Sequence, residues 1–166
     1  MYISKMRLEN FRCFEGVKEL TFNSGVNYFV GNNNCGKTTI FRAIEFLKSA
    51  KTKDGWITKG KEDEDVSVEI TLEGENLADF LEQDDLKKFQ PYLINGSKLI
   101  IRKSSELSSW KDGRGKDKEI SIKNVSAFNQ ETRIFENPFG VGDTVSALFD
   151  SQFVWSDINS DECNNF

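Results

Sequence analysis

The stretch 26–47 constrains the fold more than any other part of this 166-residue sequence. It begins with the apolar run Val26–Val30, passes through a loop bounded by two glycines, and ends in apolar residues at helical spacing. Four residues satisfy the pattern G-x-x-x-x-G-K-[ST], namely Gly31, Gly36, Lys37 and Thr38. A strand, a glycine-bounded loop and a helix in this order predict a loop that binds phosphate groups.

The residue types in the loop suit a nucleoside triphosphate with Mg²⁺. Glycines allow the backbone N–H groups to converge on a phosphate at the positive end of a helix. Lys37 is expected to bridge the β- and γ-phosphates, Thr38 to bind Mg²⁺ through its hydroxyl, and Thr39 to reach the α-phosphate. A glycine turn that only caps a helix explains neither the lysine nor the paired threonines. The expected nucleotide-binding residues of the loop are Gly31, Asn32, Asn33, Asn34, Cys35, Gly36, Lys37, Thr38 and Thr39.

Charge and residue usage exclude several classes of function. The net charge of −5 argues against a general polyanion-binding surface, and the absence of histidine excludes imidazole catalysis and histidine metal ligands within this chain. Three cysteines without a CxxC pair argue against a zinc site and a disulfide framework, and indicate a reducing cytoplasm. The N-terminus resembles no signal peptide, and no apolar run approaches the length of a membrane span, so no membrane partner is expected.

The apolar periodicity predicts one α/β unit with no internal boundary. Alternation predicts a half-buried or edge strand at 2–11, and then two strands around a turn at Ser24-Gly25, the second of them Val26–Val30. A second helix is expected at 77–89, with Asn76 as a possible N-cap and Pro91 beyond its end. The remaining expected elements are a helix from 37 to 47, strands at 66–72, 98–103 and 118–125, a polar basic loop at 104–117, and a short helix followed by an apolar strand within 142–157.

Two common classes of phosphate-loop protein do not fit. A GTPase needs an apolar strand ending in D-x-x-G, but the only such match, Asp112 to Gly115, lies in a polar loop, and no N-K-x-D element occurs. A small-molecule kinase would carry its phosphate loop near the start of the chain, whereas here a whole hairpin precedes the loop. The missing GTPase elements favour ATP over GTP.

The N-terminal hairpin resembles the ABC-type ATPases of the RecF, SMC and OLD-nuclease group. In that group an N-F-R-x-F-like element leads through an antiparallel strand to a G-x-N-x-x-G-K-[ST] loop. The matching residues here are Asn10, Phe11, Arg12, Phe14 and the loop residue Asn33. The resemblance covers residues 1–50. The layout of 51–166, with a strand, a leucine-rich helix and a further strand, is most similar to the OLD-family ATPase domain.

The resemblance implies the fold and several residue roles. It implies a P-loop NTPase of ABC-ATPase type, with a mixed sheet that has an antiparallel portion at the N-terminus. Arg12 would lie near the phosphates, although a surface salt bridge is the alternative, and Asn33 could contact the γ-phosphate or simply shape the loop. Cys35 is either a small space-filling residue or a thiol of lowered pKa at a helix N-terminus.

Several parts of an ABC-type ATPase are not found in the sequence. There is no LSGG-like signature, and the apolar segments ending at Asp150 and Asp157 are not followed by the glutamate of a Walker B strand. Gln152 is a candidate for the glutamine loop, the alternative being a polar residue at a strand start. We therefore expect 1–166 to be the N-terminal lobe of an ATPase head that binds nucleotide and hydrolyses it poorly alone.

The resemblance also implies three hypotheses for the complete protein. The first is the ATPase head of an OLD-type DNA-processing nuclease, a group often active in phage defence, with ATP driving homodimerisation of two heads. The second is a RecF- or SMC-like repair ATPase without a nuclease, and the third is a non-catalytic nucleotide-sensing or partner-binding module. Two charged segments have plain alternatives: the acidic run 62–65 is a solvated turn or a metal site, and the basic loop around Trp110 is solvated or contacts DNA.

Overall fold

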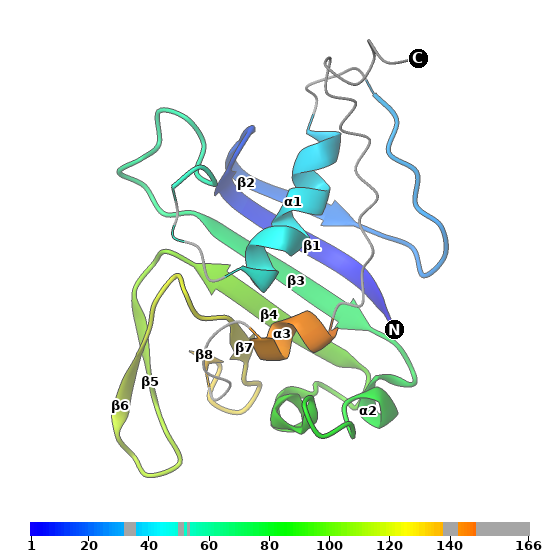
Figure 1. The fold of residues 1–166 in the computed structure, drawn as a ribbon. Helices are drawn as coiled ribbons and strands as arrows, with labels where there is room; N and C mark the ends of the chain where they lie inside the picture. Colours follow the sequence, from blue (N-terminus) through cyan, green and yellow to red (C-terminus); the bar gives the residue numbers. More distant parts are fainter. Residues whose placement is uncertain (32–35, 50–51, 53, 138–142, 149–166) are drawn as a thin grey trace, which may run out of the picture.

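The computed structural model describes residues 1–31, 36–49, 52, 54–137 and 143–148. A six-stranded antiparallel sheet, in the order β2-β1-β3-β4-β7-β8, carries helix α1 across one face with α3 beside it (Figure 1). The sheet strands are β1 (Tyr2–Phe11), β2 (Phe14–Thr21), β3 (Ser67–Glu73), β4 (Lys98–Ser104), β7 (Ser126–Phe128) and β8 (Phe135–Glu136). The other elements are α1 (Lys37–Lys48), α2 (Leu77–Phe80), the 3₁₀ helix η1 (Lys87–Tyr92), α3 (Asp143–Leu148) and the hairpin of β5 (Ser108–Lys111) and β6 (Asp117–Ile120). The predicted α/β class with an antiparallel portion is confirmed.

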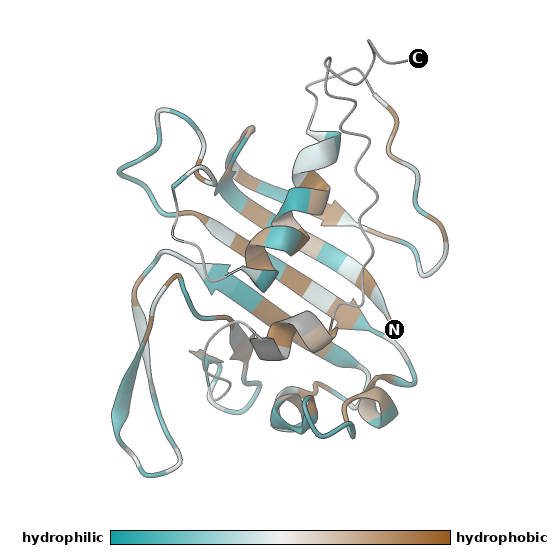
Figure 2. Ribbon diagram, in the orientation of Figure 1, coloured by the Kyte–Doolittle hydropathy of each residue, from teal (hydrophilic) through white to brown (hydrophobic). Residues whose placement is uncertain are grey.

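Alternating side chains give the sheet one apolar face. Apolar and polar residues succeed one another along the central strands, as Figure 2 shows by colour. In β3 the residues Val68, Ile70 and Leu72 are buried, and β1 and β4 contribute Leu8 and Ile101 to the same core. The predicted strand at 66–72 is confirmed, while β1 lies between β2 and β3 and so is not an edge strand.

Helix α1 buries its apolar stripe against this face. Its buried residues, Thr39, Ile40, Ala43, Phe46 and Leu47, recur every three or four positions, as an amphipathic helix requires. Three aromatic rings then join separate segments. The ring of Phe46 lies 5.4 Å from that of Phe11, at the end of β1, and 5.3 Å from that of Trp56, measured between centroids. The predicted helix from 37 to 47 is confirmed.

A fully buried lysine ties the end of α1 to β4. Lys103 donates hydrogen bonds from Nζ to the carbonyl oxygen of Phe46, at 2.9 Å, and to the carbonyl oxygen of Ser49. These acceptors belong to the last turn of α1, where the helix has unpaired carbonyls and a partial negative charge. The same Nζ lies 4.4 Å from the centroid of the Phe46 ring. Burial lowers the pKa of Lys103 to about 8.

The predicted strand Val26–Val30 is wrong for the structure as described. No strand is assigned to this segment, although a bend does occur at Ser24-Gly25. Val26, Tyr28 and Val30 are 75%, 85% and 94% exposed, and only the Phe29 ring turns inward. A strand forms only where a neighbour supplies the ladder of hydrogen bonds, and no strand of the described chain lies in that position.

The predicted helix at 77–89 is also wrong in its length. The chain forms two short pieces instead, α2 and η1, and Pro91 lies inside η1. The residue types account for the break, because the acidic run around Asp84 and Asp85 disfavours a continuous helix. The same apolar residues are nevertheless buried, namely Leu77, Leu81, Leu86 and Phe89. Asn76 does precede α2, but its side-chain oxygen accepts a hydrogen bond from the N-terminal amine and not from the helix.

The predicted basic loop at 104–117 is largely a hairpin. Strands β5 and β6 pair as a separate two-stranded sheet that projects from the main sheet (Figure 1). The predicted strand at 98–103 is confirmed as β4, and the short helix expected within 142–157 is confirmed as α3. The strand expected after that helix lies outside the described residues.

The lowered pKa of Lys103 predicts how stability changes with pH. Between about pH 8 and pH 10.5 the unfolded chain keeps this proton while the folded chain has released it. Because the unfolded state then binds more protons, the Lys103 contribution makes the free energy of unfolding rise with pH in this window. Denaturant unfolding of the wild type and of Lys103→Met at pH 7 to 10 should show the wild type gaining stability relative to the variant.

Comparison with the variant isolates this effect from other titrations. Tyr92 donates a hydrogen bond to Glu136 and its pKa is raised by burial, so it adds a pH dependence of its own above pH 10 that both proteins share. A stability difference that stays constant from pH 7 to pH 10 would show that Lys103 keeps an ordinary pKa in the fold.

Candidate functional site

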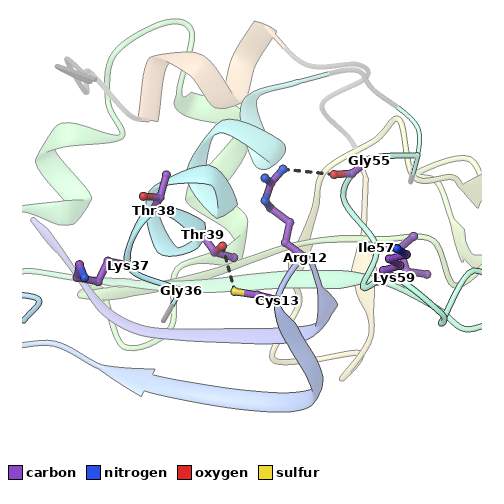
Figure 3. A pocket seen from close by; sticks show the side chains of 9 residues that line it. All are labelled: Arg12, Cys13, Gly36, Lys37, Thr38, Thr39, Gly55, Ile57 and Lys59. Atoms are coloured by element: carbon purple, nitrogen blue, oxygen red, sulfur yellow. Dashed lines mark hydrogen bonds between the residues drawn. The ribbon is translucent and has the colours of Figure 1, made fainter. Parts of the chain in front are cut away.

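A pocket of about 530 Å³ lies where α1 begins. Three segments form its walls: the β1–β2 turn, the first residues of α1, and the segment Gly55–Lys59 (Figure 3). The structure brings together five residues that the sequence predicted for the site, namely Arg12, Gly36, Lys37, Thr38 and Thr39. Its size falls in the range of small-molecule sites.

The N-terminal end of α1 lies at the pocket. Gly36 is the N-cap residue with φ 92°, and no side chain caps the helix. The first turn carries no acidic residue, and the helix is 12 residues long, so its N-terminus is positive and free of a competing carboxylate. Such an end attracts an anion, above all a phosphate group.

Gly36 is required by close packing as well as by its backbone angle. A Cβ atom on this residue would lie 2.6 Å from Cζ of Phe14 and 3.3 Å from Sγ of Cys13. The β1–β2 turn therefore presses directly on the N-cap of α1. This contact holds the turn and the helix end together as neighbouring walls of the pocket.

The two threonines after Lys37 occupy different environments. Thr38 is exposed on the pocket wall, so its hydroxyl is accessible to a metal ion. Thr39 is buried, and its hydroxyl lies 3.3 Å from Sγ of Cys13, with either atom able to donate.

Lys37 donates a hydrogen bond from Nζ to the carbonyl oxygen of Gly31, so its side chain is directed back toward Gly31. The flexible four-carbon stem of a lysine permits it to turn toward a ligand.

Arg12 extends from the β1–β2 turn along a second wall of the pocket. Its Nη1 donates a hydrogen bond of 3.3 Å to the carbonyl oxygen of Gly55, and its guanidinium lies 5.9 Å from the centroid of the Trp56 ring. Arg12 has φ 54°, an uncommon value for a residue with a side chain. It forms no salt bridge in the described structure, so the alternative of a surface ion pair is not supported.

Four further residues line the pocket that sequence reasoning missed, namely Cys13, Gly55, Ile57 and Lys59. Cys13 directly follows Arg12 and could have been found from that neighbour. Lys59 lies far from the phosphate loop in sequence, and no spacing rule indicates it. The segment reaches the site through pairing with the β1–β2 turn: an isolated bridge joins Phe11 to Ile57.

The pocket is electropositive in a chain that is acidic as a whole. Arg12, Lys37 and Lys59 are cations, and none of the nine described residues that line the pocket is acidic. A group of three cationic side chains without an acidic residue beside them suits a polyphosphate, because several negative charges are neutralised together. The donor set therefore fits Mg²⁺-bound ATP, with Thr38 as an exposed hydroxyl on the pocket wall.

Several predicted site residues cannot be placed. Asn32, Asn33, Asn34, Cys35 and the glutamine-loop candidate Gln152 lie outside the described residues. Within the part of the chain that is described, no three His, Cys, Asp or Glu side chains gather closely enough to hold a metal ion. In the same residues no helix has both the length and the apolar character needed to cross a membrane.

Comparisons with known proteins agree on the class of domain. The sequence matches the AAA ATPase domain family over residues 1–151. The DNA replication and repair protein RecF of Francisella tularensis subsp. mediasiatica (strain FSC147) is 42% identical over 52 residues, which are 31% of this chain and 15% of RecF. RecF of subsp. novicida (strain U112) matches with the same values. The chain thus aligns with only a small part of the length of these curated relatives.

A solved structure gives a weaker likeness. It comes from work on the ATP-driven dimerization and DNA-stimulated activation of SMC ATPases, and covers 72% of this chain and 69% of its own. Its TM-score is 0.46 and its sequence identity 20%.

Substitution of two pocket glycines should separate backbone strain from steric clash. Gly36 and Gly55 both have positive φ, 92° and 78°, but only Gly36 has neighbours where a Cβ would lie. Gly55→Ala should cost about 1–2 kcal/mol of stability from the backbone angle, whereas Gly36→Ala should lose about 1–3 kcal/mol more through the clash with Phe14. Denaturant unfolding measures both, and equal losses would contradict the close packing of Phe14 on Gly36.

Proposed function

The chain belongs to the AAA ATPase domain family, and we propose that it forms the ATP-binding part of a DNA-processing ATPase head of the RecF and SMC type. The observation that carries the proposal is the electropositive pocket at the N-terminus of α1, which Arg12, Lys37 and Lys59 line and whose described lining includes no acidic residue. Phosphate affinity follows from such a wall of cations and N–H donors.

Each part of the pocket has a role toward Mg²⁺-bound ATP. The N–H groups at the start of α1 hold the phosphates, and Lys37 bridges the β- and γ-phosphates once it leaves the Gly31 carbonyl. The Thr38 hydroxyl would hold Mg²⁺, which would neutralise charge on the phosphates. Arg12 and Lys59 line the walls formed by the other two segments and add positive charge there.

Hydrolysis needs groups that are not among the pocket residues. No described residue of the pocket is a carboxylate able to activate water, so the described residues would bind and orient the nucleotide without supplying a general base. We propose that residues 1–166 act as the N-terminal lobe of a head whose catalytic glutamate and signature lie elsewhere in the complete protein, and that ATP joins two such heads.

Three more specific functions are consistent with such an ATPase head. The sequence match to RecF favours a repair ATPase that acts on DNA without cutting it. The OLD-type nuclease with a role in phage defence is proposed on the layout of 51–166 alone. A metal-dependent cleavage assay on the complete protein separates these two, since only the nuclease would cut DNA. The third function, a nucleotide-sensing module, predicts binding without turnover under any condition.

Removal of the phosphate-loop lysine tests the proposed site. Lys37→Ala should weaken binding of a fluorescent ATP analogue in the presence of Mg²⁺ by about ten- to hundredfold, because charge-assisted hydrogen bonds contribute roughly 1.5–3 kcal/mol. Titration by fluorescence anisotropy measures the affinity. Lys98→Ala is the matched control, because Lys98 pairs with Glu73 on the sheet away from the pocket. Equal affinities in Lys37→Ala and the control would exclude the site.

The described pocket residues include no carboxylate, which predicts slow turnover. The purified chain should bind Mg²⁺-bound ATP yet release phosphate far more slowly than ordinary enzymes, whose turnover is about 1–1,000 per second. A coupled phosphate-release assay under saturating ATP checks this. Sustained turnover in that ordinary range, lost in Lys37→Ala, would show that the chain carries a base we have not identified.

A further inference from the structure

Asn10 lies near the end of β1, two residues before Arg12, and does not line the pocket itself. It is 5% exposed and makes three side-chain hydrogen bonds. Its Nδ2 donates to Oε2 of Glu64 and to the carbonyl oxygen of Asp65, both at 3.0 Å, and its Oδ1 accepts from the N–H of Gly16 at 2.9 Å. Both side-chain donors and the side-chain acceptor are thus engaged, and they join β2 to the acidic run 62–65.

The backbone of Asn10 belongs to the same network. Its carbonyl oxygen accepts a hydrogen bond of 2.7 Å from the N–H of Thr58, and the N–H of Arg12 donates one of 2.7 Å to the carbonyl oxygen of Trp56. The Thr58 hydroxyl also donates to the carbonyl oxygen of Phe14 at 3.0 Å. These bonds fasten the β1–β2 turn to the segment that forms the other edge of the pocket.

The turn that these bonds hold is strained. Asn10 and Arg12 have φ of 45° and 54°, and the pairing register of β1 and β2 shifts between Glu9 and Phe11. Asparagine tolerates this left-handed geometry, whereas arginine does not favour it. A strained conformation persists only where its surroundings fix it, and here the side chain of Asn10 supplies those constraints.

We propose that Asn10 is a positioning residue for the nucleotide site, which fixes the turn so that Arg12 faces the phosphates. The acidic run 62–65 is its anchor, because Glu64 and Asp65 accept both donors of its amide. Asn10 itself does not line the pocket, so it acts through Arg12 and not on the ligand. This inference rests on the proposed function.

The hydrogen bond from Lys61 lowers the pKa of Glu64, so this carboxylate stays ionised as an acceptor at neutral pH. Lys61 also forms an ion pair of 3.4 Å with Glu15. The acidic run therefore has a structural partner in Asn10 that its composition alone does not indicate.

A double-mutant cycle tests whether Asn10 acts through Arg12. Asn10→Gly removes the side chain but still permits the positive φ. Titration of the purified chain with the N-methylanthraniloyl derivative of ATP and Mg²⁺ should show Asn10→Gly and Arg12→Ala each binding about tenfold more weakly. The double variant should bind no more weakly than Arg12→Ala. Unchanged affinity in Asn10→Gly or Arg12→Ala, or losses that multiply, would overturn the proposal.

A matched control separates positioning from general stability. Asn129 holds Glu136 and two backbone N–H groups through the same kind of side-chain network, far from the pocket. Asn129→Ala should lower the denaturation midpoint and leave the affinity unchanged. If Asn10→Gly does not fold, Glu64→Ala decides, because it removes one anchor from the protein surface. Glu64→Ala should weaken binding of the probe by less than the tenfold expected for Asn10→Gly. Wild-type affinity in Glu64→Ala would overturn the proposal.

The outcome also distinguishes this inference from the proposed function. If the wild type binds the probe and Lys37→Ala does not, the nucleotide site stands, and wild-type affinity in Asn10→Gly then refutes the role of Asn10 alone. If the wild type itself binds no probe, both proposals fail.

Discussion

The pocket depends on a cluster of three aromatic rings that joins its three segments. Phe11, Phe46 and Trp56 come from β1, α1 and the segment after α1, and their ring centroids lie 5.3–5.8 Å apart. Each ring is at least 95% buried. Aromatic pairs of this kind add about 0.5–1.5 kcal/mol beyond the burial of their area. The same three segments form the pocket walls, so burial of the rings fixes the walls relative to one another. The polar side chains of the site are therefore carried by segments whose positions the aromatic cluster determines.

The pocket also differs in charge from the rest of the chain. The chain carries 27 acidic and 22 basic residues, yet the pocket collects three cations and no acid from the described residues. The acidic run 62–65 follows Lys59 closely in sequence, and its Glu64 is paired with Lys61 and Asn10. Local pairing thus takes up a carboxylate that could otherwise compete with a phosphate group. A chain that repels polyanions overall can still bind one at a single point.

The sequence predicted the parts of this fold and site that depend on local patterns. Alternation located β1, β3 and β4, helical spacing located α1, and the glycine-lysine motif located the first turn of α1 as the phosphate end. Lys59 and the role of Asn10 escaped because they depend on contacts between segments about fifty residues apart, such as the bond from Asn10 to Glu64. The helix at 77–89 was wrong because burial of Leu77 and Phe89 is satisfied by two short turns as well as by one helix.

The segment Val26–Val30 shows most directly what local pattern cannot supply. Its valine and aromatic residues favour an extended strand, and Phe29 does pack between Phe22 and Phe41, with ring centroids 5.9 and 5.8 Å away. Its other side chains remain exposed because strand propensity describes fit to a neighbouring strand, and the described chain offers none there. Exposed apolar residues directly before a phosphate loop are costly unless another surface covers them. Burial of Val26, Tyr28 and Val30 against another surface would remove this cost.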